Sequence, residues 1–201
     1  MKPELIVIAG PNGSGKTSVT NKFLHHEWAE GVTYINPDQI AKDIFGDWNS
    51  QDAVLKAANY CVELREKCLN EKKSFVFETV LSAKDKIDFL IKSKEAGFFI
   101  RVFFIGTNHP SINAARIANR VLEGGHDVPI TKIITRYSKS MLQARLAGIL
   151  SDRFYVYDNS VEDVDPKILF RLSDGKLAKK YENDIPAWAN EILKASNEFT
   201  I

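Results

Sequence analysis

Short hydrophobic runs along the chain alternate with longer stretches in which apolar residues recur every three or four positions. The runs have the length of strands and the longer stretches have a helical period, which together are typical of the strand and helix units of a parallel sheet. The expected strands cover residues 4–9, 32–36, 74–78, 98–105 and 153–157. The expected helices cover residues 15–28, 38–45, 51–71, 84–95, 111–122, 130–150 and 184–196.

This alternation predicts an α/β fold with a five-stranded, mainly parallel sheet and helices on both faces. The run at 98–105 is almost continuously apolar, as expected of a strand covered by helices on both sides, so we expect it in the sheet centre. With 201 residues the chain has the length of one domain, and we expect residues 1–201 to form a single one.

Charge and composition narrow the classes of partner. Lys and Arg number 27 and Asp and Glu number 26, which leaves a formal charge of +1 and no overall field to attract nucleic acid or an anionic membrane. The sequence contains no run of about 18 apolar residues that could cross a bilayer. We therefore expect a cytoplasmic protein without a nucleic-acid or membrane partner.

The most informative segment is the glycine-rich loop between the first expected strand and the first expected helix. It fits the pattern G-x-x-x-x-G-K-[ST], in which backbone N–H groups and the positive end of a helix surround phosphate oxygens. Gly13 and Gly15 permit backbone conformations that a Cβ would forbid. The residues expected to bind the nucleotide are Gly10, Pro11, Asn12, Gly13, Ser14, Gly15, Lys16, Thr17 and Ser18.

Two side chains of this loop have expected roles in phosphoryl chemistry. Lys16 should neutralise the outer phosphates, and the hydroxyl of Thr17 should ligate a Mg²⁺ that bridges them. The pattern Asn/Thr-Lys-x-Asp, which would hold a guanine base, is absent from the sequence. ATP with Mg²⁺ is therefore the expected nucleotide.

Two carboxylates follow expected strands, on the edge where a parallel sheet binds its ligands. Asp38 comes just after the second strand and is the first candidate to orient and deprotonate an acceptor hydroxyl. An aspartate that caps a helix or stabilises its first turn is the alternative interpretation of Asp38. Glu78 and Thr79 follow the third strand, where Glu78 is a candidate to hold the acceptor or the water around a metal ion.

A local excess of cations follows in residues 108–145, which contain six Lys or Arg residues and two acids. Arg116 and Arg120 share a helix face, where like charges repel unless an anion lies between them, and Arg136 belongs to a second pair of this spacing. We expect a helical lid at about 110–150 that closes over the phosphates, with the double glycine at 124–125 as its hinge. A solvated basic face is the alternative.

Several motifs occur together in the first four fifths of the chain: GPNGSGKTS at 10–18, NPDQIA at 36–41, FET at 77–79, ARIANRV at 115–121 and GGHDVP at 124–129. Together they resemble the zeta-toxin-like P-loop kinases, a family related in fold to toxins that phosphorylate UDP-N-acetylglucosamine. The Gly-Gly-His motif is more similar to a compact branch of uncharacterised ATPases in that family, which leaves the acceptor open.

The resemblance implies a role for individual residues. Lys16 and Thr17 would handle ATP and Mg²⁺, Asp38 would act on the acceptor hydroxyl, and Glu78 would help to hold the acceptor. The lid arginines would contact phosphates, which places this role on Arg116, Arg120 and Arg136.

The expected function is an ATP-dependent phosphotransferase that moves the γ-phosphate to a hydroxyl of a sugar nucleotide, nucleoside or similar acceptor. A small antitoxin-like protein is a further expected partner. One alternative is an ABC-like ATPase, because Leu122 to His126 resembles a degraded signature motif and Asp158 could end a Walker B strand, although Pro129 and Asn159 depart from that pattern. The other alternative is a regulatory ATP-binding module without an acceptor.

Overall fold

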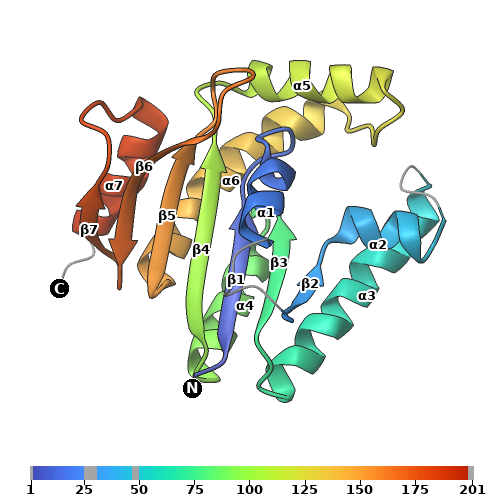
Figure 1. The fold of residues 1–201 in the computed structure, drawn as a ribbon, viewed down its shortest axis with the longest axis horizontal. Helices are drawn as coiled ribbons and strands as arrows, with labels where there is room; N and C mark the ends of the chain where they lie inside the picture. The colour runs from blue at the N-terminus through green and yellow to red at the C-terminus, as the bar shows by residue number, and fades with distance from the viewer. Residues whose placement is uncertain (1, 25–30, 47–49, 199–201) are drawn as a thin grey trace.

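The computed structural model describes residues 2–24, 31–46 and 50–198, with side chains for 2–20, 31–46 and 50–196. These residues form one sheet in the order β2-β3-β1-β4-β5-β6-β7 (Figure 1). The first five strands in this order are parallel, whereas β6 is antiparallel to β5 and β7 is antiparallel to β6. The strands are β1 (Glu4–Ala9), β2 (Thr33–Ile35), β3 (Phe75–Thr79), β4 (Phe99–Gly106), β5 (Arg153–Asp158), β6 (Lys167–Ser173) and β7 (Lys176–Lys180).

The five expected strands are all present, and β4 lies in the middle of the sheet as predicted. The predicted number of strands is wrong, because the described sheet has seven. β6 and β7 form a hairpin that turns at Asp174 and Gly175, both with positive φ, and it continues the sheet beyond β5. Every residue of β7 is exposed, so no hydrophobic pattern marks β7 in the sequence, and pairing with β6 makes it a strand.

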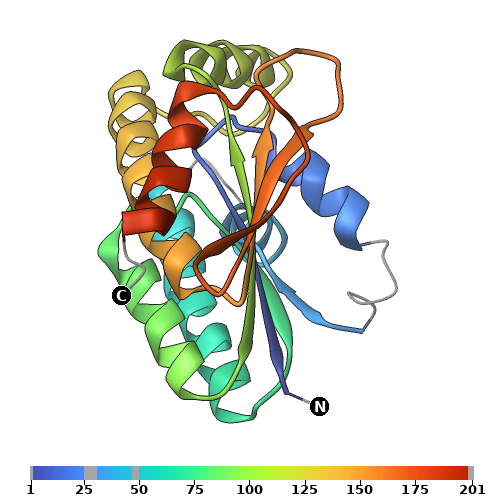
Figure 2. The same ribbon diagram turned by 90° about the vertical axis from the view of Figure 1, so that its left-hand side faces the viewer.

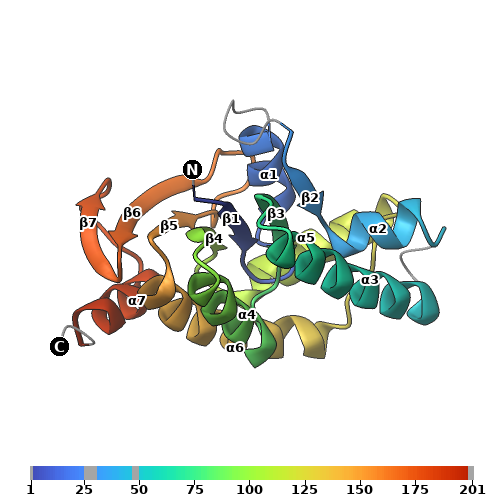
Figure 3. The ribbon, with the colours of Figure 1, turned by 90° about the horizontal axis from the view of Figure 1, so that it is seen from below.

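The helices lie on both faces of the sheet, as predicted, but unevenly. Among the described residues, α1 lies against one face, whereas α3, α4, α6 and α7 lie against the other (Figures 2 and 3). Residues 25–28 of the first expected helix lie outside the described residues. Among the helices that the structure does describe, none has the length and apolar character needed to span a membrane. The helices are α1 (Lys16–Leu24), α2 (Pro37–Asp43), α3 (Gln51–Asn70), α4 (Lys84–Glu95), α5 (Pro110–Leu122), α6 (Ile130–Leu150) and α7 (Ala187–Glu198).

The main core lies between the sheet and the four-helix face. Aromatic side chains dominate it: Phe75, Phe77, Phe104 and Phe154 are fully buried. Burial of this apolar surface is the main force that holds the sheet and these helices together.

α6 divides into two parts with different surroundings. Toward its C-terminal end, Ser140 and Ala144 are buried, and α6 packs there against α4, α7 and the sheet. Near its N-terminal end, Ile133 belongs instead to a small separate cluster with Val128 and residues of α5. The N-terminal half of α6 thus packs with α5 and the half from Ser140 onward packs with the body of the fold, while the lid at about 110–150 stays a prediction.

Candidate active site

The loops that follow the parallel strands meet at one edge of the sheet, at the top of Figure 1. Ala9 of β1 pairs with Thr79 of β3 and with Phe104 of β4, so the glycine-rich loop and the residues after β3 begin side by side. Gly106 pairs with Asp158, which brings the loops after β4 and β5 to the same edge. Open parallel sheets bind ligands at this edge, and the polar residues noted in the sequence therefore gather there.

The phosphate loop, residues 10–15, is held in shape by three other segments of the chain. The last residue of β3 accepts a hydrogen bond from a backbone N–H of the loop. Side chains of α5 and of the loop after β5 donate to two carbonyl groups of the loop. These bonds are Gly10 N to Thr79 O (3.2 Å), Asn113 Nδ2 to Asn12 O (2.7 Å) and Asn159 Nδ2 to Ser14 O (2.8 Å).

Two positions of the loop require glycine, because of their backbone angles and because Asn113 and Asn159 lie close to them. Gly13 and Gly15 have φ values of +74° and +90°, in the left-handed region that favours glycine. A Cβ on Gly13 would lie 2.5 Å from the carbonyl oxygen of Asn113, and a Cβ on Gly15 would lie 2.2 Å from Asn159 Nδ2. Backbone conformation and close packing both exclude larger residues here.

A buried chain of hydrogen bonds supports Asn113 from behind. Thr107 and Asn113 are fully buried, and the Thr107 hydroxyl donates to Asn113 Oδ1. Tyr137 of α6 donates through its hydroxyl to the carbonyl of Thr107 at 2.6 Å. We did not identify Asn113 from the sequence. The signal was available, because Asn113 and Ile117 are four apart and a polar residue thus occupies the apolar face of α5.

Lys16 lies at the start of α1 and folds back over the loop. Its ammonium group donates to the carbonyls of Gly10 at 2.8 Å and Pro11 at 3.0 Å. Thr17 and Ser18, the next two residues, are exposed on the first turn of α1. The hydroxyl of Thr17 is therefore accessible to a ligand at the helix N-terminus.

The surroundings of Lys16 contain charges of both signs. Burial lowers the pKa of Lys16, the negative charges of Glu78 and Asp38 oppose that shift, and the positive charges of Arg120 and Arg136 reinforce it. Four of the residues predicted to take part in phosphoryl transfer are thus within electrostatic range of the same ammonium group.

Asp38 is not the cap of α2. Asn36 is the N-cap, and its side chain accepts hydrogen bonds from the backbone N–H of Asp38 (2.9 Å) and Gln39 (3.2 Å). Asp38 lies in the first turn and is exposed, and in the described part of the chain its carboxylate has neither a hydrogen bond nor an ion pair. The capping part of the alternative raised by the sequence is therefore excluded, whereas the first-turn part agrees with the structure, and the exposed carboxylate is also accessible to a ligand.

Glu78 is instead buried and fixed. Its carboxylate accepts hydrogen bonds from the hydroxyl of Thr20 on α1 and from that of Tyr34 at 2.7 Å, and Asn36 Nδ2 donates to Tyr34 Oη at 2.9 Å. Burial, and then the charge of Glu78, raise the pKa of Tyr34, so the phenol stays protonated and donates. Tyr34 and Thr20 are supporting residues that the sequence did not reveal.

Thr79 has a local structural role. Its hydroxyl accepts a hydrogen bond from the backbone N–H of Leu81 at 3.0 Å. Leu81 is buried with φ of +53°, an unfavourable conformation for a residue other than glycine. The hydroxyl predicted to bind the acceptor is thus already used to shape the turn after β3.

Arg120 lies at the end of α5 and is enclosed by the glycine segment. Its Nη2 donates to the carbonyl of His126 at 2.7 Å, whereas its buried Nε has no partner among the described residues. Gly124, with φ of +82°, follows the end of α5, and a Cβ on Gly125 would lie 2.5 Å from Arg120 Cγ. Gly125 thus packs against Arg120, whereas a Cβ on Gly124 would meet no atom within 4 Å, and the role of the double glycine as a hinge stays a prediction.

The other two predicted arginines have different contacts. Arg136 of α6 reaches the phosphate loop, with Nη1 at 3.5 Å from Asn12 Oδ1. Arg116 donates to the carbonyls of Asn159 (2.8 Å) and Val161 (3.1 Å) in the loop after β5. For Arg116 to contact phosphates directly, its guanidinium group would have to leave the carbonyls of Asn159 and Val161.

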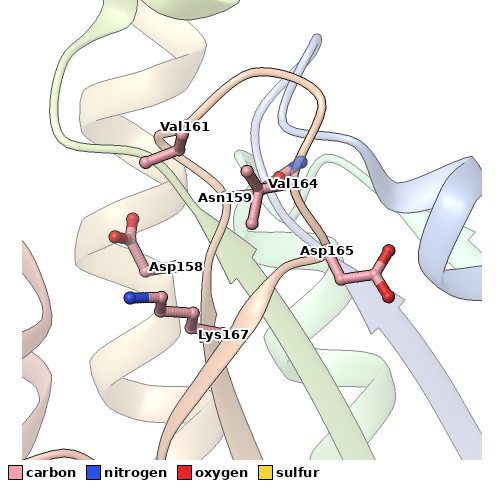
Figure 4. Close-up of a pocket in the computed structure, with 6 residues that line it drawn as sticks. All are labelled: Asp158, Asn159, Val161, Val164, Asp165 and Lys167. Carbon is pink, nitrogen blue, oxygen red and sulfur yellow. The ribbon is translucent and has the colours of Figure 1, made fainter.

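The loop after β5 encloses a small hollow beside the phosphate loop (Figure 4). Its volume is ≈ 60 Å³, far below the roughly 300–1,000 Å³ of small-molecule sites, so it does not hold a nucleotide base as it stands. The hollow is lined by Asp158, Asn159, Val161, Val164, Asp165 and Lys167.

Comparison of the sequence with known proteins identifies a family and one related protein. The model of the family described as Zeta toxin matches residues 1–160. A protein of Haemophilus influenzae described as uncharacterized is 31% identical over 137 residues, which are 68% of this chain and 94% of that protein.

Two solved structures are similar at low sequence identity. A chain of the PezAT chromosomal toxin-antitoxin system of Streptococcus pneumoniae has a TM-score of 0.63 at 14% identity, over 98% of this chain and 85% of that chain. A chain of AvrRxo1-ORF1:-ORF2 with ATP has a TM-score of 0.64 at 14% identity, over 98% and 76%. At these identities the likeness shows the shared fold, an α/β P-loop fold of the kinase-like type.

Proposed function

We propose that this chain, which belongs to the Zeta toxin family, transfers the γ-phosphate of ATP to a hydroxyl group of a small-molecule acceptor. The observation that carries the proposal is the mixed charge around Lys16. Cations alone would suit any anion site, but two carboxylates in the same field suit a reaction in which a hydroxyl must also be oriented.

Two buried polar atoms, one in the phosphate loop and one on α5, support the choice of a phosphate ligand. Ser14 Oγ and Arg120 Nε are buried without a partner in the described residues, and a buried polar group without a hydrogen bond is unfavourable. Phosphate oxygens are suitable acceptors for both donors. The structure of AvrRxo1-ORF1:-ORF2, which has a similar fold, is described as containing ATP, and this supports the choice of nucleotide.

The residues present fit a Mg²⁺ ion bound together with the nucleotide. The exposed Thr17 hydroxyl would ligate it, and Glu78, fixed close to Lys16, would hold a water molecule of its coordination shell. Mg²⁺ is usually held by few protein oxygens and by substrate phosphates, and no group of three or more His, Cys, Asp or Glu residues suited to a metal occurs in the described residues. When bound, the ion neutralises charge on the outer phosphates.

In the proposed reaction Asp38 accepts the proton of the acceptor hydroxyl. The oxygen then forms a bond to the γ-phosphorus as the bond from that phosphorus to the bridging oxygen of ADP breaks. Lys16, Arg120 and Arg136 stabilise the charge that spreads over the transferred phosphoryl group. The acceptor class that we propose is a sugar nucleotide, a nucleoside or a similar alcohol.

A screen of acceptors tests this function. The purified chain is incubated with Mg-ATP and with nucleosides, sugar nucleotides and small alcohols in turn, and products are analysed by mass spectrometry. We expect ATP consumption to depend on one acceptor class and to yield its phosphorylated form. Hydrolysis of ATP at one rate throughout, with no phosphorylated product, would instead favour the ABC-like or regulatory alternatives.

We include a small antitoxin-like protein among the proposed partners, because PezAT is described as a toxin-antitoxin system and its chain shares this fold. Expression of the chain alone is then expected to slow bacterial growth, and the Lys16→Ala variant is expected to relieve that effect. Equal growth inhibition by both proteins would contradict a toxic kinase activity.

A further inference from the structure

The hydrogen bonds around Glu78 continue in two directions. On one side, Thr20 donates to Glu78, and its hydroxyl also lies 3.0 Å from the carbonyl oxygen of Lys16. On the other side, Tyr34 donates to Glu78 at 2.7 Å and accepts from Asn36 Nδ2 at 2.9 Å. A continuous hydrogen-bond network, formed by Thr20, Glu78, Tyr34 and Asn36, therefore links the first residue of α1 to the cap of α2.

The side-chain amide of Asn36 is used at both ends. Its Oδ1 accepts from the backbone N–H groups of Asp38 at 2.9 Å and Gln39 at 3.2 Å, while its Nδ2 donates to Tyr34. The first turn of α2, which carries Asp38, is thus tied to the position of the Tyr34 hydroxyl. At the opposite end of the network is Lys16, the residue proposed to stabilise the transferred phosphoryl group.

α2 has little other support from the nucleotide side. The strand before it, β2, has three residues, lies at the edge of the sheet and pairs with β3, which separates β2 from β1 and the phosphate loop (Figure 1). α2 itself packs mainly against α3. The position of α2 relative to the phosphate loop therefore depends strongly on the network.

The residue types at positions 34 and 36 exceed what the local fold requires. Phe at position 34 would have the same ring and would lack only the hydroxyl that bonds Glu78 and Asn36. Ser at position 36 would cap α2 about as well as Asn, but it has no amide group to donate to Tyr34. Each side chain thus carries a polar group that serves the network.

We propose that Tyr34 and Asn36 are positioning residues that couple the phosphate loop to the acceptor base. A nucleotide that fixes Lys16 would fix, through the network, the first turn of α2, and Asp38 then lies where it can accept the proton of the acceptor hydroxyl. The inference rests on the proposed phosphotransferase function, in which Asp38 is the catalytic residue. The coupling matters because a displacement of about 1 Å at reacting groups can lower a rate about 100-fold.

Amide hydrogen exchange tests the coupling without turnover. Exchange of the backbone N–H groups of α2 is measured with and without a non-hydrolysable ATP analogue, at concentrations that saturate each protein. We expect the analogue to slow this exchange about tenfold in the wild type, and less than about twofold in Tyr34→Phe and Asn36→Ser. Equal slowing in these three proteins, or no slowing in the wild type, would overturn the coupling.

Tyr60→Phe is the matched control for the loss of a phenol hydroxyl. Tyr60 is exposed on α3, and among the described residues its contact is an edge-to-face packing of its ring against Phe45, which the substitution keeps. This variant should retain the full effect of the analogue on α2.

Turnover in two backgrounds tests whether the network acts through Asp38. In the phosphotransfer assay we expect Tyr34→Phe and Asn36→Ser each to lower kcat about tenfold, with the KM for ATP close to wild type. In the Asp38→Asn background the same substitutions should have no further effect, because the residue that they position is already lost. A fall by the same factor in both backgrounds is the result of a merely structural role and would overturn the proposal.

The outcomes separate this inference from the proposed function. Phosphotransfer that responds to Asp38→Asn, but not to Tyr34→Phe or Asn36→Ser, would overturn the positioning role and leave the function standing. Absence of phosphotransfer to every acceptor would overturn the function, and the exchange experiment would still decide whether the network couples the phosphate loop to α2.

Discussion

Two carbonyl groups of the phosphate loop are bonded by side chains from other segments, whereas three exposed charged side chains beyond the loop have no partner among the described residues. Asn113 and Asn159 bond the loop carbonyls. Asp38, Lys132 and Lys139 are exposed and have no salt-bridge partner within residues 2–20, 31–46 and 50–196. The nucleotide side is therefore preorganised before any ligand binds, which is how fixed dipoles stabilise transferred charge without reorganisation.

The phosphate loop and the acceptor side therefore differ in the kind of ligand that each can recognise. A triphosphate has the same structure in every ATP-dependent reaction, so a loop of fixed backbone groups can bind it. The acceptor side presents individual charges on exposed positions, and its preference therefore depends on a few side chains that can be replaced without disturbing the core. Substitutions on the two sides should accordingly separate catalysis, nucleotide binding and stability.

The largest effect is expected on the acceptor side from Asp38→Asn. Asn has the same size but cannot accept the proton, so transfer to the acceptor should fall by about 10²- to 10⁴-fold while affinity for an ATP analogue stays close to wild type. Because Asn36 caps α2, thermal stability should not change. Steady-state rates and equilibrium binding measure the two effects. Asp43→Asn, at the exposed end of the same helix, is the control. A wild-type rate for Asp38→Asn would remove its catalytic role.

A somewhat smaller effect on turnover is expected from Lys16→Ala. Loss of one preorganised cation at the transferred phosphoryl group should lower turnover by about 10²- to 10³-fold. Thr17→Ala should act in the same direction through Mg²⁺. Lys16 bonds only to carbonyls of its own loop, so the thermal midpoint should stay near that of the wild type. Unchanged ATP binding and turnover in both variants would refute the nucleotide assignment.

The smallest effect is expected from Asn113→Ala, which removes a side chain that supports the phosphate loop. The substitution leaves the Asn12 carbonyl and the Thr107 hydroxyl without their partner, which should lower the free energy of unfolding by about 1–3 kcal/mol. Affinity for ATP should also fall, because the loop loses a support. Denaturant unfolding and ATP-analogue binding measure both changes, and Asn119→Ala on the exposed face of α5 is the control. Equal stability of the two variants would show that the loop does not depend on this bond.

Much of the fold could be predicted because its elements have strong local patterns. The strand at 98–105 is apolar except for Arg101 and is the central strand β4. β7 has no such pattern, because all its residues are exposed, and the prediction therefore missed the hairpin. The sequence also could not show that the two halves of α6 have different neighbours, because both halves have helical periodicity and only packing distinguishes them.

The sequence predicted more about the phosphate loop than about the contacts of the acceptor-side carboxylates. The loop pattern placed the glycine-rich loop between β1 and α1, where the structure has it, and phosphate binding by its residues stays a prediction. The sequence assigned Asp38 and Glu78 to one site, but it could not show that Glu78 is held by Thr20 and Tyr34 while Asp38 has no partner in the part of the chain that the structure describes. Hydrogen bonds between residues far apart in the chain leave no mark in local spacing.

By itself, the sequence determined the parallel α/β fold, the phosphate loop and the identity of the charged groups near it, because period, spacing and residue chemistry act over short stretches of chain. Only the tertiary structure decided what those groups touch: Arg116 bonded to the loop after β5, Arg136 reaching Asn12, and Glu78 joined through Tyr34 to the cap of α2. Such contacts depend on how helices and strands pack across the sheet, and this packing brings together residues that are more than forty positions apart.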